Sequence, residues 1–160
     1  MAASLLIVEG DLLQQPVDAI VNAWNRNMIP WWLLLPKGVS GAIKRRAGLA
    51  PFRELARAGW LPLGGAVLTS AGRLPFRGII HVAGLNLLWV GSERAVKLCV
   101  HSALAVATKH HYRSVAFPLI GAGTGGLPAD RVEHIMVEAV ESSNFEGEVR
   151  LVRYRAMSTD

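Results

Sequence analysis

Residues 114–127, SVAFPLIGAGTGGL, contain the clearest chemical signal in the sequence. The β-branched and aromatic run at residues 114–117 predicts a buried strand that ends at Pro118. Residues 121–126 then include four glycines, and a helical pattern follows them. Between a strand and a helix start, glycines let backbone N–H groups approach an anion closely, and the helix dipole favours negative charge. We therefore expect this segment to cradle a phosphate or pyrophosphate.

Two other interpretations of the glycine segment stay open. The glycines could serve only a tight connecting turn. Gly121, Gly123 and Gly126 also satisfy G-x-G-x-x-G, the fingerprint of dinucleotide-binding Rossmann domains. That fingerprint belongs near the first strand, with an acidic ribose ligand about 20 residues further on. Glu141 stands at that distance but within a helical pattern, which argues against the Rossmann interpretation.

Length and composition indicate one globular domain over residues 1–160. The chain is 51% hydrophobic and 18% charged, and it is long enough to bury a core without disulfides. Cys99 is the single cysteine, and no His, Cys, Asp and Glu cluster has metal-ligand spacing, so we expect no disulfide and no metal. The N-terminus lacks the basic region of a signal peptide, and no apolar run reaches the roughly 18 residues of a membrane span. We expect a cytoplasmic protein without a membrane partner.

The formal net charge of +5 at pH 7 favours anionic partners such as nucleotides. The basic residues are scattered, apart from Lys44, Arg45 and Arg46 and a series at residues 150–155. Such scatter is usually a solvated surface, so nucleic-acid binding is not indicated.

Strand and helix patterns alternate along the chain. Strands are expected at residues 4–8, 18–21, 66–70, 78–82, 114–117 and 148–154. Helices are expected at residues 40–47, 52–58, 92–107 and 129–142. This alternation predicts an α/β domain with three layers. His81, inside an apolar strand, is expected to be a core histidine rather than a catalyst.

Three further motifs accompany the glycine segment. They are G-D-L-L at residues 10–13, D-A-I-V-N-A-W-N at residues 18–25 and G-V-S-G-A-I at residues 38–43. Together with the segment SVAFPLIGAGTGG, this ordered set resembles a macro domain, the ADP-ribose-binding module. The resemblance covers the chain from about Leu5 to Tyr154. It implies a three-layer α/β/α fold with a mixed central β-sheet, and ADP-ribose in a crevice at the strand ends.

The resemblance also implies roles for the matched residues. Asp11 would accept a hydrogen bond from the adenine amine, as an ionised carboxylate can, although a turn or cap role is the alternative after a glycine. Leu12 would present backbone and apolar surface to the adenine ring. Asn25 would hydrogen-bond the distal ribose, whereas Asn22 would hold loop backbone. The two loops around the ligand would comprise Gly38, Val39 and Ser40, and Gly121, Ala122, Gly123, Thr124, Gly125 and Gly126.

Three departures from the family pattern bear on activity. Residues 28–35, with the run from Trp31 to Leu35, form an apparent insertion that could pack on the core, cover the distal ribose or form a homo-oligomer or partner interface. Ser40 stands where one hydrolase subgroup carries an aspartate thought to orient water, and a serine without a partner is no general base at neutral pH. Gly125 stands where many members place an aromatic residue against the distal ribose.

The expected function is binding of ADP-ribose and hydrolysis of its derivatives at the distal ribose. Mono-ADP-ribosyl groups, O-acetyl-ADP-ribose and ADP-ribose-1''-phosphate are the candidate substrates, and no cofactor is implied. Asn25 and the second loop would orient the attacking water, with Asn25 as the catalytic residue. The alternative is a non-catalytic reader of ADP-ribosylated partners. Ser40 favours the reader, and a free-standing domain favours the enzyme.

Overall fold

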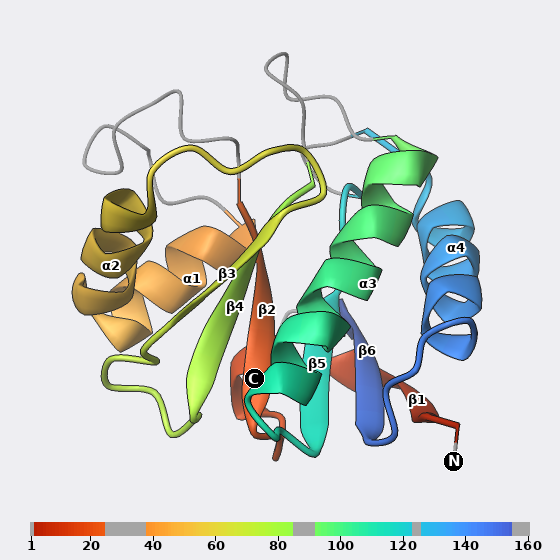
Figure 1. The fold of residues 1–160 in the computed structure, drawn as a ribbon, viewed down its shortest axis with the longest axis horizontal. Helices are drawn as coiled ribbons and strands as arrows, with labels where there is room; N and C mark the ends of the chain where they lie inside the picture. The colour runs from red at the N-terminus through yellow and green to blue at the C-terminus, as the bar shows by residue number, and fades with distance from the viewer. Residues whose placement is uncertain (1, 25–37, 85–91, 123–125, 155–160) are drawn as a thin grey trace, which may run out of the picture.

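The computed structural model describes residues 2–24, 38–84, 92–122 and 126–154, and these residues form six strands and four α-helices (Figure 1). The strands are β1 Ser4–Gly10, β2 Ala19–Trp24, β3 Ala66–Thr69, β4 Gly78–Ala83, β5 Ser114–Pro118 and β6 Glu148–Tyr154. The helices are α1 Gly38–Ala47, α2 Ala50–Ala58, α3 Glu93–Lys109 and α4 Ala129–Glu141, and a 3-10 turn, η1 Leu12–Gln14, follows β1.

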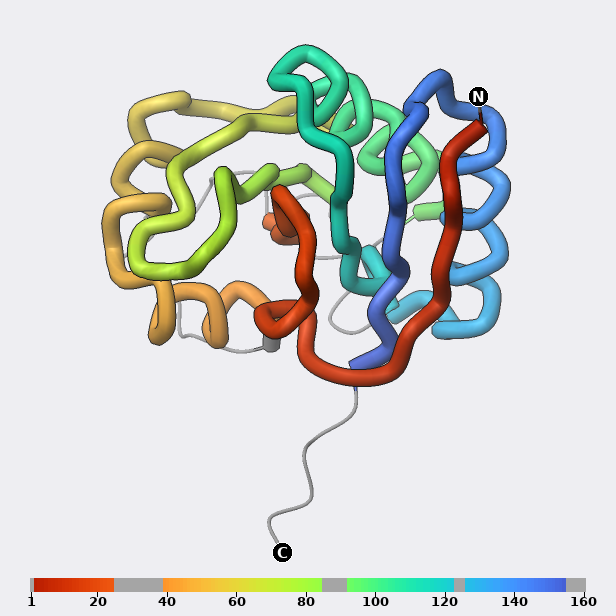
Figure 2. Tube along the Cα trace, turned by 90° about the horizontal axis from the view of Figure 1, so that it is seen from below, coloured from red at the N-terminus to blue at the C-terminus, as the bar shows by residue number. Residues whose placement is uncertain are grey.

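The strands form one mixed sheet in the order β1-β6-β5-β2-β4-β3. Only β3, which pairs with β4, runs antiparallel to its neighbour. The other five strands point the same way, so their C-terminal ends share one edge of the sheet. Helices α1 and α2 lie against one face of the sheet and α3 and α4 against the other (Figures 1 and 2). The predicted three-layer α/β/α architecture with a mixed sheet is therefore confirmed.

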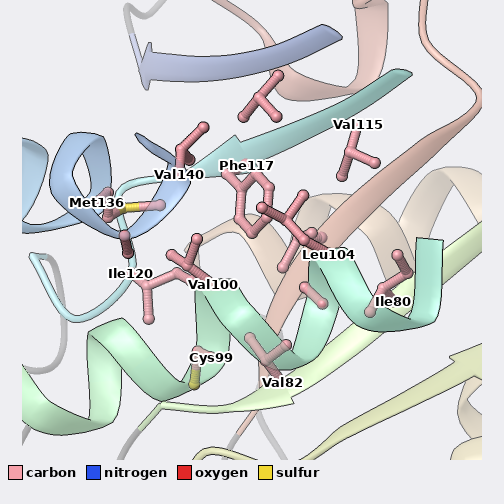
Figure 3. Close-up of a cluster of buried hydrophobic side chains, with 14 of the residues drawn as sticks. Ile80, Val82, Cys99, Val100, Leu104, Val115, Phe117, Ile120, Met136 and Val140 are labelled. Atoms are coloured by element: carbon pink, nitrogen blue, oxygen red, sulfur yellow. The ribbon is translucent and has the colours of Figure 1, made fainter. Parts of the chain in front are cut away.

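Two apolar clusters join the helices to the sheet. Val100, Leu104 and Phe117 belong to the cluster between the sheet and the pair α3 and α4 (Figure 3). Ile43 and Phe52 belong to the cluster under α1 and α2. Because strand side chains alternate between faces, each buried strand supplies both clusters. The clusters hold the strand ends in fixed relative positions, which is what a site at those ends requires.

Helix α3 follows its predicted apolar period. The seven positions expected to face the core are all at most 2% exposed: Ala95, Val96, Cys99, Val100, Ala103, Leu104 and Ala107. Ser92 caps the helix, since its Oγ accepts a hydrogen bond from the Ala95 N–H at 3.1 Å. Burial also raises the pKa of the Cys99 thiol to about 12, so Cys99 is a core residue and not a thiolate nucleophile.

Some element boundaries differ from the predicted ones. Helix α2 begins at Ala50 rather than at residue 52, because Pro51 fits the first turn, where a missing N–H breaks no helical bond. Strand β1 extends to Gly10 and β2 to Trp24, since their pairing with β6 and β4 continues past the apolar patterns. Helix α1 begins at Gly38 rather than at residue 40. Among the described helices, none is long and apolar enough to cross a membrane.

Leu104→Ala should destabilise the fold much more than the same substitution at Leu98 on the same helix. Leu104 is 2% exposed within the α3 cluster, whereas Leu98 is 40% exposed. Loss of a buried leucine and the cavity it leaves cost about 2–5 kcal/mol, and we expect below about 1 kcal/mol at Leu98. Urea unfolding of both variants measures the difference. Equal losses would contradict the assigned core.

Candidate functional site

The C-terminal edge of the sheet carries the predicted site residues that the structure describes. Asp11 and Leu12 follow β1, Ser40 lies at the start of α1 after β2, and Gly121 and Ala122 follow β5. Since β1, β2 and β5 are parallel, these segments leave the sheet at one edge. Four predicted site residues and the Trp31 to Leu35 insertion lie outside the described residues: Asn25, Gly123, Thr124 and Gly125.

Strands β2 and β5 are paired only at their beginnings. Their register joins Ala19 to Val115 and Ile20 to Ala116, whereas β2 pairs with β4 over all six of its residues. Beyond Ile20 the two strands are neighbours in the sheet order without a continuing ladder. The ladder between β2 and β5 therefore stops short of the edge where the glycine segment and α1 begin.

The chain connections change direction at the same place. From β2 the chain passes through α1 and α2 on one face, and from β5 it passes through α4 on the other face (Figure 1). In α/β sheets, ligands bind outside the C-terminal ends of two adjacent strands whose connections leave to opposite faces. The arrangement of β2 and β5 meets that condition.

The second loop has the backbone geometry expected of its glycines. Gly121 and Gly126 have φ angles of +82° and +74°, in the left-handed region that favours glycine. The Leu127 N–H donates to the Gly121 carbonyl at 3.1 Å and closes the loop at its base. A Cβ on Gly126 would meet no described atom within 4 Å, so its φ angle, and not crowding by the protein, requires glycine there. This segment follows the fifth strand, unlike a Rossmann fingerprint.

Gly38, Val39 and Ser40 lie in the first turn of α1 rather than in a loop. The first-turn N–H groups of a helix have no intrahelical acceptor, and the helix dipole makes that end electropositive. No acidic side chain lies in this turn. The start of α1 is therefore compatible with an anion at the strand ends.

Asp11 already has two partners within the protein. Its Oδ1 accepts from the Leu13 N–H at 2.8 Å and caps η1, and its Oδ2 accepts from Arg46 Nη1 at 3.1 Å. The capping alternative is thus confirmed, while a carboxylate retains lone pairs for a further donor. The Leu12 side chain is 5% exposed in the α1 and α2 cluster, so it offers little apolar surface to a ligand.

A buried chain of hydrogen bonds runs from β3 to the start of α1. Ser40 Oγ donates to Asn22 Oδ1 at 2.7 Å, and Asn22 Nδ2 lies 3.0 Å from His81 Nδ1. His81 Nε2 lies 2.8 Å from Thr69 Oγ1, which donates to the Ser70 carbonyl at 3.0 Å. Asn22 and His81 are fully buried.

His81 is a core histidine, as predicted. Burial lowers its pKa to about 3, so the imidazole is neutral at physiological pH. It lies beside Asn22 in the parallel register of β2 and β4, and its ring packs edge-on against Phe52 at 5.9 Å. Sequence reasoning missed the role of Thr69. The available signal was that Asn22 and His81 are polar residues within apolar strands.

A cavity of about 450 Å³ lies at the opposite, N-terminal edge of β2 and β5. Its lining includes Asp18, Ser114 and Phe76. Asp18 Oδ2 accepts from the Arg113 N–H at 2.7 Å, and Ser114 Oγ accepts from the Asp18 N–H at 2.8 Å. These polar groups serve the protein backbone, so we place the candidate site at the C-terminal edge. Within the described segments, no group of three or more His, Cys, Asp or Glu residues could hold a metal.

Comparisons with known proteins agree with this fold. The family model described as "Macro domain" matches residues 21–136. A macro domain-containing protein from Streptomyces griseus is 40% identical over 94% of this chain and 87% of its own length. A Salmonella gallinarum protein named O-acetyl-ADP-ribose deacetylase is 36% identical over 88% of this chain and 79% of its own. The structure of an Oceanobacillus iheyensis macrodomain mutant with ADPR has a TM-score of 0.77 and 30% identity, covering 92% of this chain and 83% of that one.

The chain therefore belongs to the macro domain family.

The buried state of His81 makes the stability depend on pH. Its pKa falls from 6.5 to about 3 on folding, so between these values the unfolded chain binds more protons than the folded one. The free energy of unfolding should be highest above pH 6.5 and decrease as pH falls, approaching about 1.4 kcal/mol per pH unit below about pH 6.

Urea unfolding at about pH 7, 6 and 5 measures this slope. In His81→Gln, the free energy of unfolding should change with pH between pH 6 and 5 by about 1.4 kcal/mol per pH unit less, because Gln does not titrate. Glu54 and Glu133, whose hydrogen bonds lower their carboxyl pKa values, contribute in the same direction toward pH 5, but they do so in both proteins, so the difference between the two slopes reports His81. Identical slopes in both proteins would contradict the assignment.

Proposed function

We propose that the protein binds ADP-ribose at the C-terminal ends of β2 and β5. The observation that carries this proposal is that the β2–β5 ladder ends early and that the chain leaves the C-terminal ends of these two strands to opposite faces of the sheet. The left-handed glycines of the second loop follow β5, and the first turn of α1, which holds no acidic side chain, follows β2. A relative solved with ADPR and the family membership support the choice of ligand.

Each part of the ligand has a proposed partner. The pyrophosphate meets the N–H groups of residues 121–126 and of the first turn of α1, where no acidic side chain lies. Asp11 accepts from the adenine amine with the lone pairs that Leu13 and Arg46 leave open. Asn25 hydrogen-bonds the distal ribose.

We further propose that the protein hydrolyses ADP-ribosyl derivatives at the distal ribose in the cytoplasm. Water attacks with Asn25 and the second loop holding it in place, and the loop dipoles stabilise the developing charge. Ser40 donates a hydrogen bond to Asn22, an amide that cannot take up its proton, so Ser40 does not serve as the general base. The Salmonella relative named O-acetyl-ADP-ribose deacetylase supports an ester substrate. A non-catalytic reader is the second candidate, which the serine at position 40 favours.

Asp11→Ala should weaken ADP-ribose binding by about 1.5–3 kcal/mol, the range for a hydrogen bond to a charged group. The matched control is Arg46→Ala, which removes the ion pair at a half-exposed side chain and leaves the carboxylate in place. We expect it to change binding by less than about 1 kcal/mol. Titration calorimetry of both variants checks this. Equal losses would assign Asp11 to the protein scaffold and not to adenine.

Asn25→Ala should reduce turnover of O-acetyl-ADP-ribose about 10- to 100-fold and affect ADP-ribose affinity less, because misplaced reactants lose rate. Release of free ADP-ribose measures turnover, and mono-ADP-ribosylated protein serves as a second substrate. Binding without any turnover of either substrate by the unmodified protein would favour the reader. A loss confined to KM would instead show uniform binding by Asn25.

A further inference from the structure

We propose that Thr69 and His81 are positioning residues that set the direction of the hydrogen bonds reaching Ser40. In the proposed direction, the Ser40 hydroxyl donates a hydrogen bond to Asn22 Oδ1. Its oxygen then accepts a hydrogen bond from a hydroxyl donor, either water or a ribose hydroxyl of the ligand. This proposal rests on the proposed ADP-ribose site.

The direction of the hydrogen bonds follows from the Ser70 carbonyl, the end of the series that can act only as an acceptor. The Thr69 hydroxyl donates a hydrogen bond to the Ser70 carbonyl, which can only accept, at 3.0 Å. Thr69 Oγ1 then accepts from His81 Nε2–H, and a neutral imidazole carries one N–H, which leaves Nδ1 as an acceptor. The Asn22 amide nitrogen donates to Nδ1, and its oxygen therefore accepts from Ser40.

Burial keeps water and a second imidazole proton out of this chain. Thr69 is 4% exposed, and Asn22 and His81 are fully buried. Low polarity strengthens the hydrogen bonds and makes an unpaired group costly. Desolvation also holds His81 neutral, so the imidazole has one N–H donor and one acceptor nitrogen. A change at Thr69 is therefore transmitted to Ser40.

If the hydrogen bonds ran in the opposite direction, one of them would be weaker. In it Thr69 would donate to His81 Nε2, the Asn22 amide would be inverted, and Ser40 would donate to the Ala23 carbonyl. The distance from Ser40 Oγ to that carbonyl is 3.3 Å, beyond the usual range of a hydroxyl donor, whereas the Thr69 to Ser70 link is 3.0 Å. Thr69 therefore selects the direction in which Ser40 accepts.

An accepting Ser40 suits the proposed chemistry. When the hydroxyl hydrogen of a serine is engaged in a hydrogen bond, its oxygen can only accept from a neighbouring O–H group. It then acts as a carboxylate oxygen does, but without the charge. It can orient a hydroxyl without removing its proton. The buried hydrogen bonds thus let Ser40 orient a hydroxyl as a catalytic carboxylate does, but not remove its proton.

Thr69→Val tests the proposal, and Thr69→Ser is its matched control. Valine keeps the shape of threonine but cannot accept from His81, so the imidazole proton should move to Nδ1 and the amide should invert. Nitrogen-15 NMR of the imidazole should show the Nε2–H tautomer in the unmodified protein and in Thr69→Ser, and the Nδ1–H tautomer in Thr69→Val. We expect Thr69→Val to lose affinity or turnover about three- to tenfold, the effect of one hydrogen bond.

A double-mutant cycle with Ser40→Ala separates positioning from general destabilisation. If Thr69 acts through Ser40, Thr69→Val should have little further effect on ADP-ribose in the Ser40→Ala background. Additive losses would overturn the proposal, and so would the Nδ1–H tautomer in the unmodified protein or an unchanged tautomer in Thr69→Val. The tautomer of the unmodified protein decides the direction even if Thr69→Val does not fold. Failure to bind ADP-ribose, with the Nε2–H tautomer present, would refute the proposed function and the role of Ser40 in it, but not the direction.

Discussion

The short parallel pairing of β2 with β5 is the constraint on which the rest of the structure depends. Backbone hydrogen bonds join the two strands only over Ala19 and Ile20 of β2, while β4 and β6 hold their outer sides over longer ladders. The ladder between the two strands is thus confined to their N-terminal ends. Apolar clusters on both faces keep this arrangement rigid, because closely packed interiors resist displacement. A ligand site between loops needs such a scaffold, since loops alone position groups poorly.

The polar chain under α1 is a second element of that scaffold. It links β3, β4, β2 and α1 through side chains that are buried in the sheet face which α1 and α2 cover. Burying these groups would be unfavourable without partners, and no buried side-chain nitrogen or oxygen of the described residues lacks one. A satisfied network of this kind stabilises less by its net energy than by allowing one arrangement of its members. Here that arrangement includes the first turn of α1.

The sequence predicted best what local patterns determine. The period of α3 identified its buried side chains, and the glycines of residues 121–126 indicated a loop with left-handed backbone, observed at its two ends. The pairing of Asn22 with His81 was not predictable in this way, because it depends on which strands become neighbours across 59 residues of chain. The helical start at Gly38 was missed because Gly38 has poor helix propensity and packing overrides it. For Asp11 the sequence could not distinguish capping from ligand binding, since both require the same carboxylate.

The central claim is that ADP-ribose binds at the C-terminal edge of the sheet between β2 and β5. Titration of the nitrogen-15-labelled protein with ADP-ribose, followed by amide NMR spectra, tests this claim most directly. The account predicts the largest shifts at Ser40, at Gly121 and Gly126, and around Asp11. Shifts centred on the opposite edge, around Asp18 and Phe76 of the cavity there, would contradict it.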